Sequence, residues 1–474
     1  MTGRRLTWVQ PEDLLGHELR QATEDGRDAA GFARRWQRAG GLPAPVRAGA
    51  SPDPAPPRLR ALAVELLDEL DRLPGPLAAR EPAELSAIRA ACPSWPAPSP
   101  HRFVFSAHQL ESAWLGRAVG CLLGRPVEKL PLAGIRALAR ATGNWPLHTW
   151  FTARGLPAEL ATAHPWNRRS APNSLAENID GMPEDDDLDY PLLNLLLLRR
   201  HGRDFTTAQV ASVWLDTLPA GRTFTAERIA YRNLLGGIEP PHTARHHNPF
   251  REWIGAAIRA DVHGWSHPGD PGAAAEQAYR DATLSHTGNG VYAAMFVAAV
   301  IAAAAGAEDV HACLRTGLRV VPPGSRLAEA VRVGIGTARA ERDFATVADR
   351  LHAAYGHYHW VHAVPNAALL AAALTHADGE FDGSICRAVS GGWDTDSNGA
   401  TAGSVAGLLT GHPARLPERW TAPLKNRLAT SVTGFGGPGQ DGTVLDGIGF
   451  DALAELTRAL TRPRTPTRQE APRT

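Results

Sequence analysis

The stretch SGGWDTDSNGATAGSVAGLLTG, residues 390–411, joins a pair of aspartates to a run of regularly spaced glycines. Its last four glycines recur every fourth residue: Gly399, Gly403, Gly407 and Gly411. This spacing places them on one face of a helix. Glycine costs about 1 kcal/mol relative to alanine inside a helix, so a stripe of glycines predicts a close approach of the backbone to another element.

A second stretch, ESAWLGRAVGCLLGRPVEKLP at residues 111–131, carries the same pattern at Gly116, Gly120 and Gly124. The two stripes indicate either a tight crossing of helices or helices that pass close to a ligand, and these interpretations are compatible. Many other segments rich in alanine and leucine also have helical spacing, and little strand-like alternation is present. We therefore expect an all-α fold, a compact domain of many helices.

The proline-rich segments 42–58 and 93–100 divide the chain and are typical of linkers. Between them, leucines at three- and four-residue spacing predict an amphipathic helix: Leu59, Leu62, Leu66, Leu70 and Leu73. We expect a helical accessory region over residues 1–100 and one domain over residues 101–462. The last residues, 463–474, are rich in proline and arginine and predict a disordered tail.

The composition excludes several classes of protein. The 474 residues have a formal net charge of zero and a pI near 7.4, so no general binding of nucleic acid is expected. Four cysteines without a CxxC pair argue against a disulfide framework or a cysteine zinc site, and we expect a cytoplasmic protein. The apolar segment from Gly290 is dominated by alanine, which favours a buried helix over a membrane span.

Two acidic clusters are the candidates for chemistry. The segment NIDGMPEDDDLDYPLL, residues 178–193, has five acids in six positions from Glu184 to Asp189. Such a cluster is typical of a solvated loop or a helix N-terminus. Asp394 and Asp396, however, have no basic partner nearby in sequence, and carboxylates that are brought together need a cation. Oxygen ligands suit Mg²⁺, Ca²⁺ or Mn²⁺, but a helix–loop–helix calcium site is excluded because Val405 stands where that loop needs glutamate.

The order of these motifs resembles the ADP-ribosylglycohydrolase superfamily, which includes the dinitrogenase-reductase-activating glycohydrolases. The resemblance spans residues 108–450 and is carried by GRAVGCLLGRPVE, PEDDD, SHTGNGVYAAMFVAAVIAAA and GGWDTDSNGATAGSVAG. It implies an all-α enzyme with two Mg²⁺ ions, for which Mn²⁺ could substitute. The implied reaction is hydrolysis of the bond between C1″ of ADP-ribose and a protein side chain or related acceptor. The implied partner is ADP-ribose or an ADP-ribosylated protein.

The same resemblance assigns individual residues. Asp394, Asp396 and Ser397 fall on the late metal motif of the family. The early Thr-Asp-Asp-Thr motif falls on residues 184–187, where both threonines are replaced by acids. Asp185 and Asp186 are the expected metal ligands, while Glu184 is a candidate and Asp187 could bind or face solvent. Glu128 matches a carboxylate beside the metals, and His286 matches a histidine close to the ribose or pyrophosphate. The general base stays open between Glu128, Asp185 and Asp186.

Glycine-rich starts of helices favour phosphate groups, because their backbone N–H groups are free to donate. On this ground we expect substrate binding at Gly288, Asn289, Gly290, Gly391 and Gly392. Two other functions are compatible with the sequence. The changed threonines could leave a catalytically silent ADP-ribose-binding protein, and paired carboxylates could serve a metal-independent glycosidase.

Overall fold

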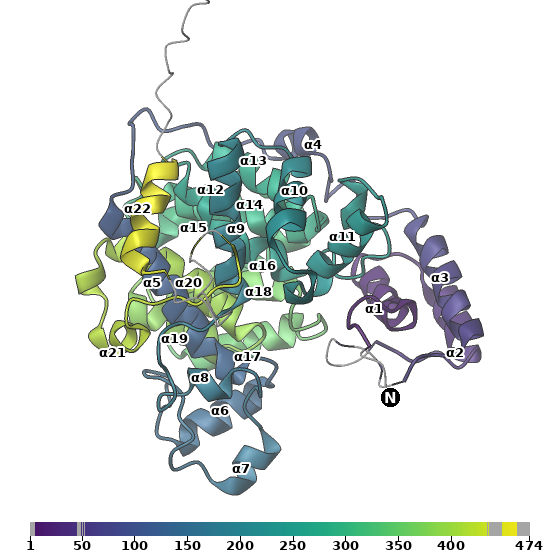
Figure 1. Ribbon diagram of the computed structural model, residues 1–474, viewed down its shortest axis with the longest axis horizontal. Coiled ribbons are helices and arrows are strands. Elements are labelled where there is room, and N and C mark those ends of the chain that lie inside the picture. The colour runs from purple at the N-terminus through teal and green to yellow at the C-terminus, as the bar shows by residue number, and fades with distance from the viewer. Residues whose placement is uncertain are drawn as a thin grey trace, which may run out of the picture.

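The computed structural model describes residues 5–44, 49, 51, 53–433, 435 and 448–461. Within these residues the chain forms 22 α-helices and no β-strand, with only three isolated bridges. The expectation of an all-α fold is confirmed, and Figure 1 shows the helices stacked around a central group. The tail expected over residues 463–474 lies outside the described residues.

The helices follow one another along the chain as follows. The first hundred residues contain α1 (Pro11–Glu24), α2 (Ala30–Arg38), α3 (Pro57–Asp71) and α4 (Leu85–Ala91). The next segment contains α5 (Ala107–Gly124), η1 (Arg125–Val127), α6 (Leu132–Ala141), α7 (Ala158–Ala163), α8 (Ala171–Ser174), α9 (Asp186–His201), α10 (Thr207–Thr217), η2 (Ala220–Arg222), α11 (Thr225–Leu235) and η3 (His242–Ala244).

The remainder contains η4 (Ile254–Arg259), α12 (Asp261–Trp265), α13 (Pro271–Ala282), α14 (Gly288–Ala303), α15 (Val310–Leu318), α16 (Arg326–Ala340), α17 (Phe344–Tyr355) and α18 (Ala363–His376). It ends with α19 (Phe381–Ser390), α20 (Thr395–Thr410), η5 (Pro413–Arg415), α21 (Glu418–Thr421), η6 (Ala422–Leu424) and α22 (Phe450–Thr461).

The two glycine stripes face each other across the contact between α5 and α20. A Cβ atom built on Gly120 would lie 1.9 Å from the carbonyl oxygen of Gly399, and one on Gly403 would lie 2.0 Å from that of Gly116. Only glycine allows two backbones to approach this closely. The predicted tight crossing is confirmed, except that Gly411 has another role: it ends α20 in the left-handed conformation, with φ of +80°.

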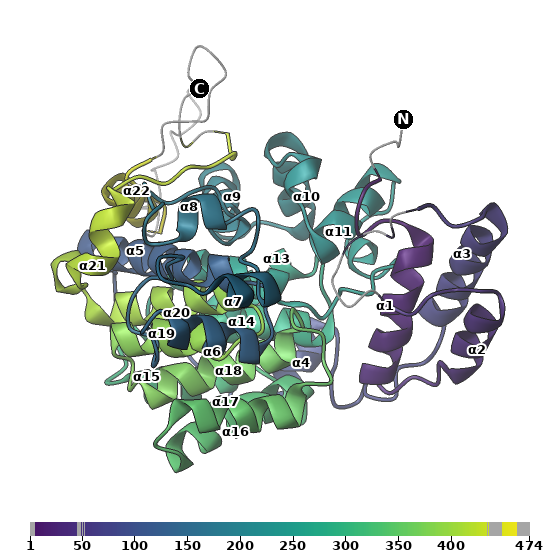
Figure 2. The same ribbon diagram turned by 90° about the horizontal axis from the view of Figure 1, so that it is seen from below.

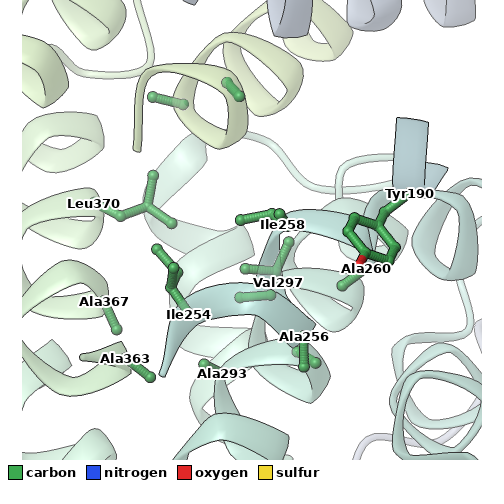
Figure 3. Close-up of a cluster of buried hydrophobic side chains, with 14 of the residues drawn as sticks. Tyr190, Ile254, Ala256, Ile258, Ala260, Ala293, Val297, Ala363, Ala367 and Leu370 are labelled. Atoms are coloured by element: carbon green, nitrogen blue, oxygen red, sulfur yellow. The ribbon is translucent and has the colours of Figure 1, made fainter. Parts of the chain in front are cut away.

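The core beneath this crossing is built from small apolar side chains. In Figure 3, Ile254, Ala256 and Ile258 of η4 and the following Ala260 belong to a cluster of buried hydrophobic side chains. Residues of α9, α14 and α18 complete this cluster. Residues of α14 from Asn289 to Ala302 are buried all round, as the alanine-rich sequence predicted. No helix among the described residues has the length and apolar character needed to cross a membrane.

Helices α1, α2 and α3 form a group at one edge of the molecule in both views (Figures 1 and 2). The leucine stripe of α3 faces inward, with Leu66 and Leu70 fully buried. Helix α1 packs on the rest of the chain through polar contacts, because Glu18 pairs with Arg251 at 2.7 Å and Gln21 donates to Glu252 at 2.8 Å. The N-terminal region is thus docked on the segment that leads into η4.

Candidate active site

Three helix ends build the candidate site. The side chain of Thr395, the first residue of α20, donates to the carbonyl oxygen of Gly124, the last residue of α5, at 2.8 Å. This contact brings Glu128, just past the end of η1, towards the start of α20. The start of α9 lies beside both, because Ser397 Oγ donates to Asp187 Oδ2 at 3.3 Å. Residues 210 positions apart in sequence therefore meet at one place.

These ends line a pocket with a volume of about 400 Å³. Every residue expected to bind metal lines it: Glu184, Asp185, Asp186, Asp394, Asp396 and Ser397. Glu128 and Asp187 line it as well. The acids come from two helix N-termini, where the helix dipole favours negative charge. The two acidic segments singled out in the sequence are thus brought together, and Glu128 lines the same pocket.

Part of the early acidic segment is already neutralised by the protein. Asp185 caps α9 by accepting from the backbone N–H of Asp187 at 3.0 Å, and it pairs with Arg125 at 2.5 Å. Arg117 pairs with Asp187 at 3.4 Å, and Glu184 pairs with Arg222 at 3.0 Å.

The other carboxylates of the pocket lack such partners. Among the described residues, Asp186, Asp394 and Asp396 form no ion pair with a lysine or arginine within 4.0 Å. Burial, and then repulsion from neighbouring acids, raises the pKa of Asp186 and of Asp394 well above the ordinary 3.8. The same two causes raise the pKa of Asp396 to about 7. A cation bound beside these carboxylates would favour their ionised forms.

Glu128 is held differently. Asn167 Nδ2 donates to Glu128 Oε2 at 2.6 Å, and Lys129 Nζ lies 2.7 Å from Glu128 Oε1. Burial alone would lower the pKa of Lys129, but Glu128 and the nearby aspartates raise it above 10.5, so the ammonium stays charged. Lys129 also sits 5.9 Å from the ring centre of Trp360, another residue of the pocket wall. The Glu128 carboxylate is therefore fixed in place at the edge of the pocket.

The donor set fits a hard divalent cation. Its accessible groups are carboxylates and the Ser397 hydroxyl, and such oxygen ligands suit Mg²⁺ or Mn²⁺. Cys121, Asp185 and Asp187 each place one donor atom within 4.8 Å of the other two. The Cys121 thiol is not a magnesium ligand, however, and burial raises its pKa well above the ordinary 9.0, so it stays protonated.

The predicted phosphate-binding segment at the start of α14 does not line this pocket. The backbone N–H and the side-chain amide of Asn289 both donate to Glu252 Oε1, at 3.1 and 3.0 Å. An internal carboxylate thus already occupies the N-terminus of α14, where a phosphate was expected. Gly288 lines a different pocket of about 570 Å³ between α3 and the domain, and a Cβ on Gly290 would lie 2.6 Å from the carbonyl oxygen of Arg251.

His286 is fully buried behind the pocket wall rather than in it. Its Nε2 lies 3.8 Å from Glu227 Oε1, and Glu227 lines the pocket. Burial, and then the charge of Arg259, lowers the pKa of His286 well below 6.5, so the ring is neutral. His286 reaches the ligand space only through Glu227.

Gly391 and Gly392 also lie outside the pocket lining. The carbonyl oxygen of Gly391 accepts from His352 Nε2 at 2.8 Å, and Gly392 has φ of +82°. These residues end α19 and turn the chain into α20, and the ring of Trp393 stacks on that of His352. The glycines here serve the turn that aims Asp394 at the pocket.

Sequence reasoning missed several residues of the pocket wall. The basic residues Arg125 and Lys129 flank Glu128 in sequence, but nothing in their pattern showed which acids they would meet. Glu227 and Phe224 come from the start of α11, and Trp8 comes from the segment before α1. Glu227, Phe224 and Trp8 belong to no periodic pattern or motif, so only their position in space reveals them.

The fold and the pocket define an all-α protein with carboxylates gathered at helix ends. A family model described as ADP-ribosylglycohydrolase matches residues 107–460, so the chain belongs to the ADP-ribosylglycohydrolase family, a family of hydrolases. A search of curated proteins finds no match. A solved structure titled "ADP-ribosylglycohydrolase-related protein complex" is similar with a TM-score of 0.46 and 19% identity, covering 75% of this chain and 99% of that one.

Proposed function

We propose that this protein is a magnesium-dependent hydrolase that cleaves the C1″ glycosidic bond between ADP-ribose and a protein side chain or a related acceptor. One observation carries the proposal: Asp394 and Asp396 are buried and Asp186 is half-buried in one pocket, and none of the three forms an ion pair with a lysine or arginine among the described residues. A structural cluster of this kind would oppose folding, whereas a cation site needs it.

Two divalent ions held by these carboxylates and by Ser397 would supply a polarised water and stabilise negative charge on the ribose oxygens. Asp185 and Asp187 position this set. Asp185 caps α9 and so fixes the direction in which Asp186 points, and Asp187 holds Ser397 against α9. The protein thus supplies orientation on both sides of the ligand space.

Glu128 is our choice for the general base. It lines the pocket, and Asn167 and Lys129 hold its carboxylate oriented. In this role Glu128 accepts the proton of the attacking water as the water bonds to C1″ and the bond from C1″ to the acceptor breaks. Asp185 is less suited, because it caps the N-terminus of α9 and so holds the start of that helix.

The decisive experiment follows release of ADP-ribose from ADP-ribosylated protein and from ADP-ribosyl-arginine, with saturating Mg²⁺ and with excess EDTA. Release that requires Mg²⁺ and returns when the ion is restored supports the proposal. Equal release in EDTA would instead indicate a metal-independent glycosidase. Binding of ADP-ribose without any release would indicate a binding protein, and absence of both would refute the family activity for this chain.

Glu128→Gln tests the base. The substitution keeps the size of the side chain and an acceptor for Asn167, but it removes the proton acceptor. We expect kcat to fall by about 10²–10⁴-fold, while Mg²⁺ still raises the melting temperature as it does in the wild type. A variant with wild-type kcat would transfer the role to another group, and one that no longer responds to Mg²⁺ would make Glu128 a metal ligand.

A further inference from the structure

The segment before α1 reaches the acidic pocket. Trp8 lines this pocket together with the carboxylates of α9 and α20, although the family match begins only at residue 107. A region outside the matched domain therefore contributes a side chain to the ligand space.

Trp8 is anchored rather than loosely placed. Its indole meets the ring of Phe224 edge-to-face, with 5.7 Å between ring centres and 83° between planes. The guanidinium of Arg228 lies 5.2 Å from the centre of Trp8 and 5.8 Å from that of Phe224. Arg228 also donates to Thr7 Oγ1 at 2.9 Å. The chain is thus tied to α11 immediately before the indole.

The rest of the N-terminal region supports the same wall. His17 of α1 packs edge-to-face on Phe250 and Trp253, with ring centres 5.1 and 5.9 Å apart. These two residues lead directly into Ile254, which lines the pocket. The docking of α1 therefore holds one side of the pocket while Trp8 forms part of another.

The chemistry of this wall is aromatic and polarisable. Phe224 lines the pocket beside Trp8, and the indole Nε1 is buried without a hydrogen-bond partner in the described part of the chain. A wall of this kind offers a π surface, which suits a planar group. Flat groups stack on aromatic side chains with a gain of about 1–3 kcal/mol for a nucleobase.

We infer that Trp8 is a specificity-determining residue, which together with Phe224 recognises a planar group of the ligand. This inference rests on the proposed function. Such a ligand has two planar groups, the nucleobase of ADP-ribose and a flat acceptor such as the guanidinium of arginine. If Trp8 recognises the ligand, the N-terminal region is part of the substrate site.

The test uses the full chain with Trp8→Ala, the conservative variant Trp8→Phe, and Leu6→Ala as the control. Leu6 is close in sequence but 54% exposed, and it is absent from the pocket lining. Affinity for ADP-ribose and for ribose 5-phosphate is measured by calorimetry, and kcat and KM are measured for ADP-ribosyl-arginine. Melting temperatures identify any variant that is misfolded.

If Trp8 stacks on the nucleobase, Trp8→Ala should weaken ADP-ribose binding about tenfold or more and leave ribose 5-phosphate unchanged. If Trp8 contacts the acceptor, ADP-ribose binding should be unchanged while KM for ADP-ribosyl-arginine rises by a similar factor. In both cases kcat should change little, Trp8→Phe should keep most of the affinity, and Leu6→Ala should behave as wild type.

Wild-type binding and KM in a folded Trp8→Ala variant would overturn the inference and leave the proposed function intact. An equal loss for ADP-ribose and ribose 5-phosphate would also overturn it, since that result indicates a structural role. If Trp8→Ala does not fold, Trp8→Leu at the same position decides by the same criteria. A wild-type protein that binds no ADP-ribose and releases none would overturn the proposed function and this inference together.

Discussion

Two helix N-termini of this protein, those of α14 and α20, hold buried carboxylates. The carboxylate at the start of α14 pairs with an arginine, whereas those at the start of α20 form no such pair among the described residues. At the start of α14, Glu252 accepts from the N-terminal N–H of the helix and pairs with Arg326 at 2.9 Å, and Arg326 also holds Glu81 at 2.7 Å. Burial alone would raise the pKa of Glu252, but Arg326 and His362 bring it well below 4.5.

At the start of α20 the outcome is reversed. Asp396 is buried like Glu252, yet burial, and then Glu128 and Asp185, raise its pKa to about 7. A buried acid at a helix start is therefore structural where the protein supplies its own cation. It is a candidate cation site where the protein does not.

The largest effect is expected from removing the internal cation. Arg326→Ala would leave Glu252 and Glu81 buried without a counter-charge, and breaking a buried pair in this way costs about 3–5 kcal/mol. Arg89→Ala is the matched control, because the Arg89–Glu276 pair is half-exposed and should cost less than about 1 kcal/mol. The measurement is the free energy of unfolding in urea. Equal losses of unfolding free energy in the two variants would contradict a structural role for Arg326 between Glu252 and Glu81.

A smaller effect is expected from the pH dependence of the metal-free protein. Because the pKa of Asp396 is raised from 3.8 to about 7, its protonated form favours folding at low pH. That contribution is complete below about pH 4 and is lost as the pH rises through about 7. In EDTA the contribution of Asp396 to the free energy of unfolding should therefore fall by about 4 kcal/mol over this window.

Asp396→Asn should flatten this fall, because the amide cannot ionise. Saturating Mg²⁺ should raise wild-type stability by about 2.7 kcal/mol at a hundredfold excess over Kd, and it should raise that of Asp396→Asn much less. Parallel pH curves and equal responses to Mg²⁺ would remove Asp396 from the metal site.

The smallest effect is expected at the glycine contact between α5 and α20, which brings the pocket residues together. A Cβ on Gly120 would lie 1.9 Å from the backbone oxygen of Gly399, so Gly120→Ala should push α5 from α20 at a cost of about 1–3 kcal/mol. The control is Gly336→Ala in α16, where the new Cβ meets nothing within 4 Å and should gain up to about 1 kcal/mol. Melting temperatures that shift in the same direction in both variants would contradict the packing role of the glycine contact between α5 and α20.

Patterns that are local in sequence predicted much of this molecule. The spacing of Gly116, Gly120 and Gly124 predicted a helix with a closely packed face, and the leucines of α3 predicted the face that is buried. The acids before α9 and α20 were recognisable by their composition and by their resemblance to family motifs. Each of these signals lies within one or two helical turns, where side-chain spacing alone fixes the face.

The residues whose surroundings could not be predicted from sequence have neighbours from other segments of the chain. The glycines of residues 288–290 looked free to bind phosphate, but Glu252, 37 positions earlier, occupies the helix start. Arg125 and Lys129 lie in or beside a quoted motif, but their acidic partners could not be predicted from it, and Trp8 lines the site from outside the matched domain. The residues that surround them depend on tertiary packing and not on spacing along the sequence.

The all-α class, the two glycine-striped helices and the two acidic segments could be predicted from sequence, because helical periodicity and glycine spacing act within one element. Which of the acids are paired depends on the folded arrangement of the whole chain. That choice depends on where Arg117, Arg125 and Arg326 end up among buried carboxylates. The electrostatic free energy of a buried charge is set by neighbours within a few ångströms, and these neighbours come from anywhere in the chain.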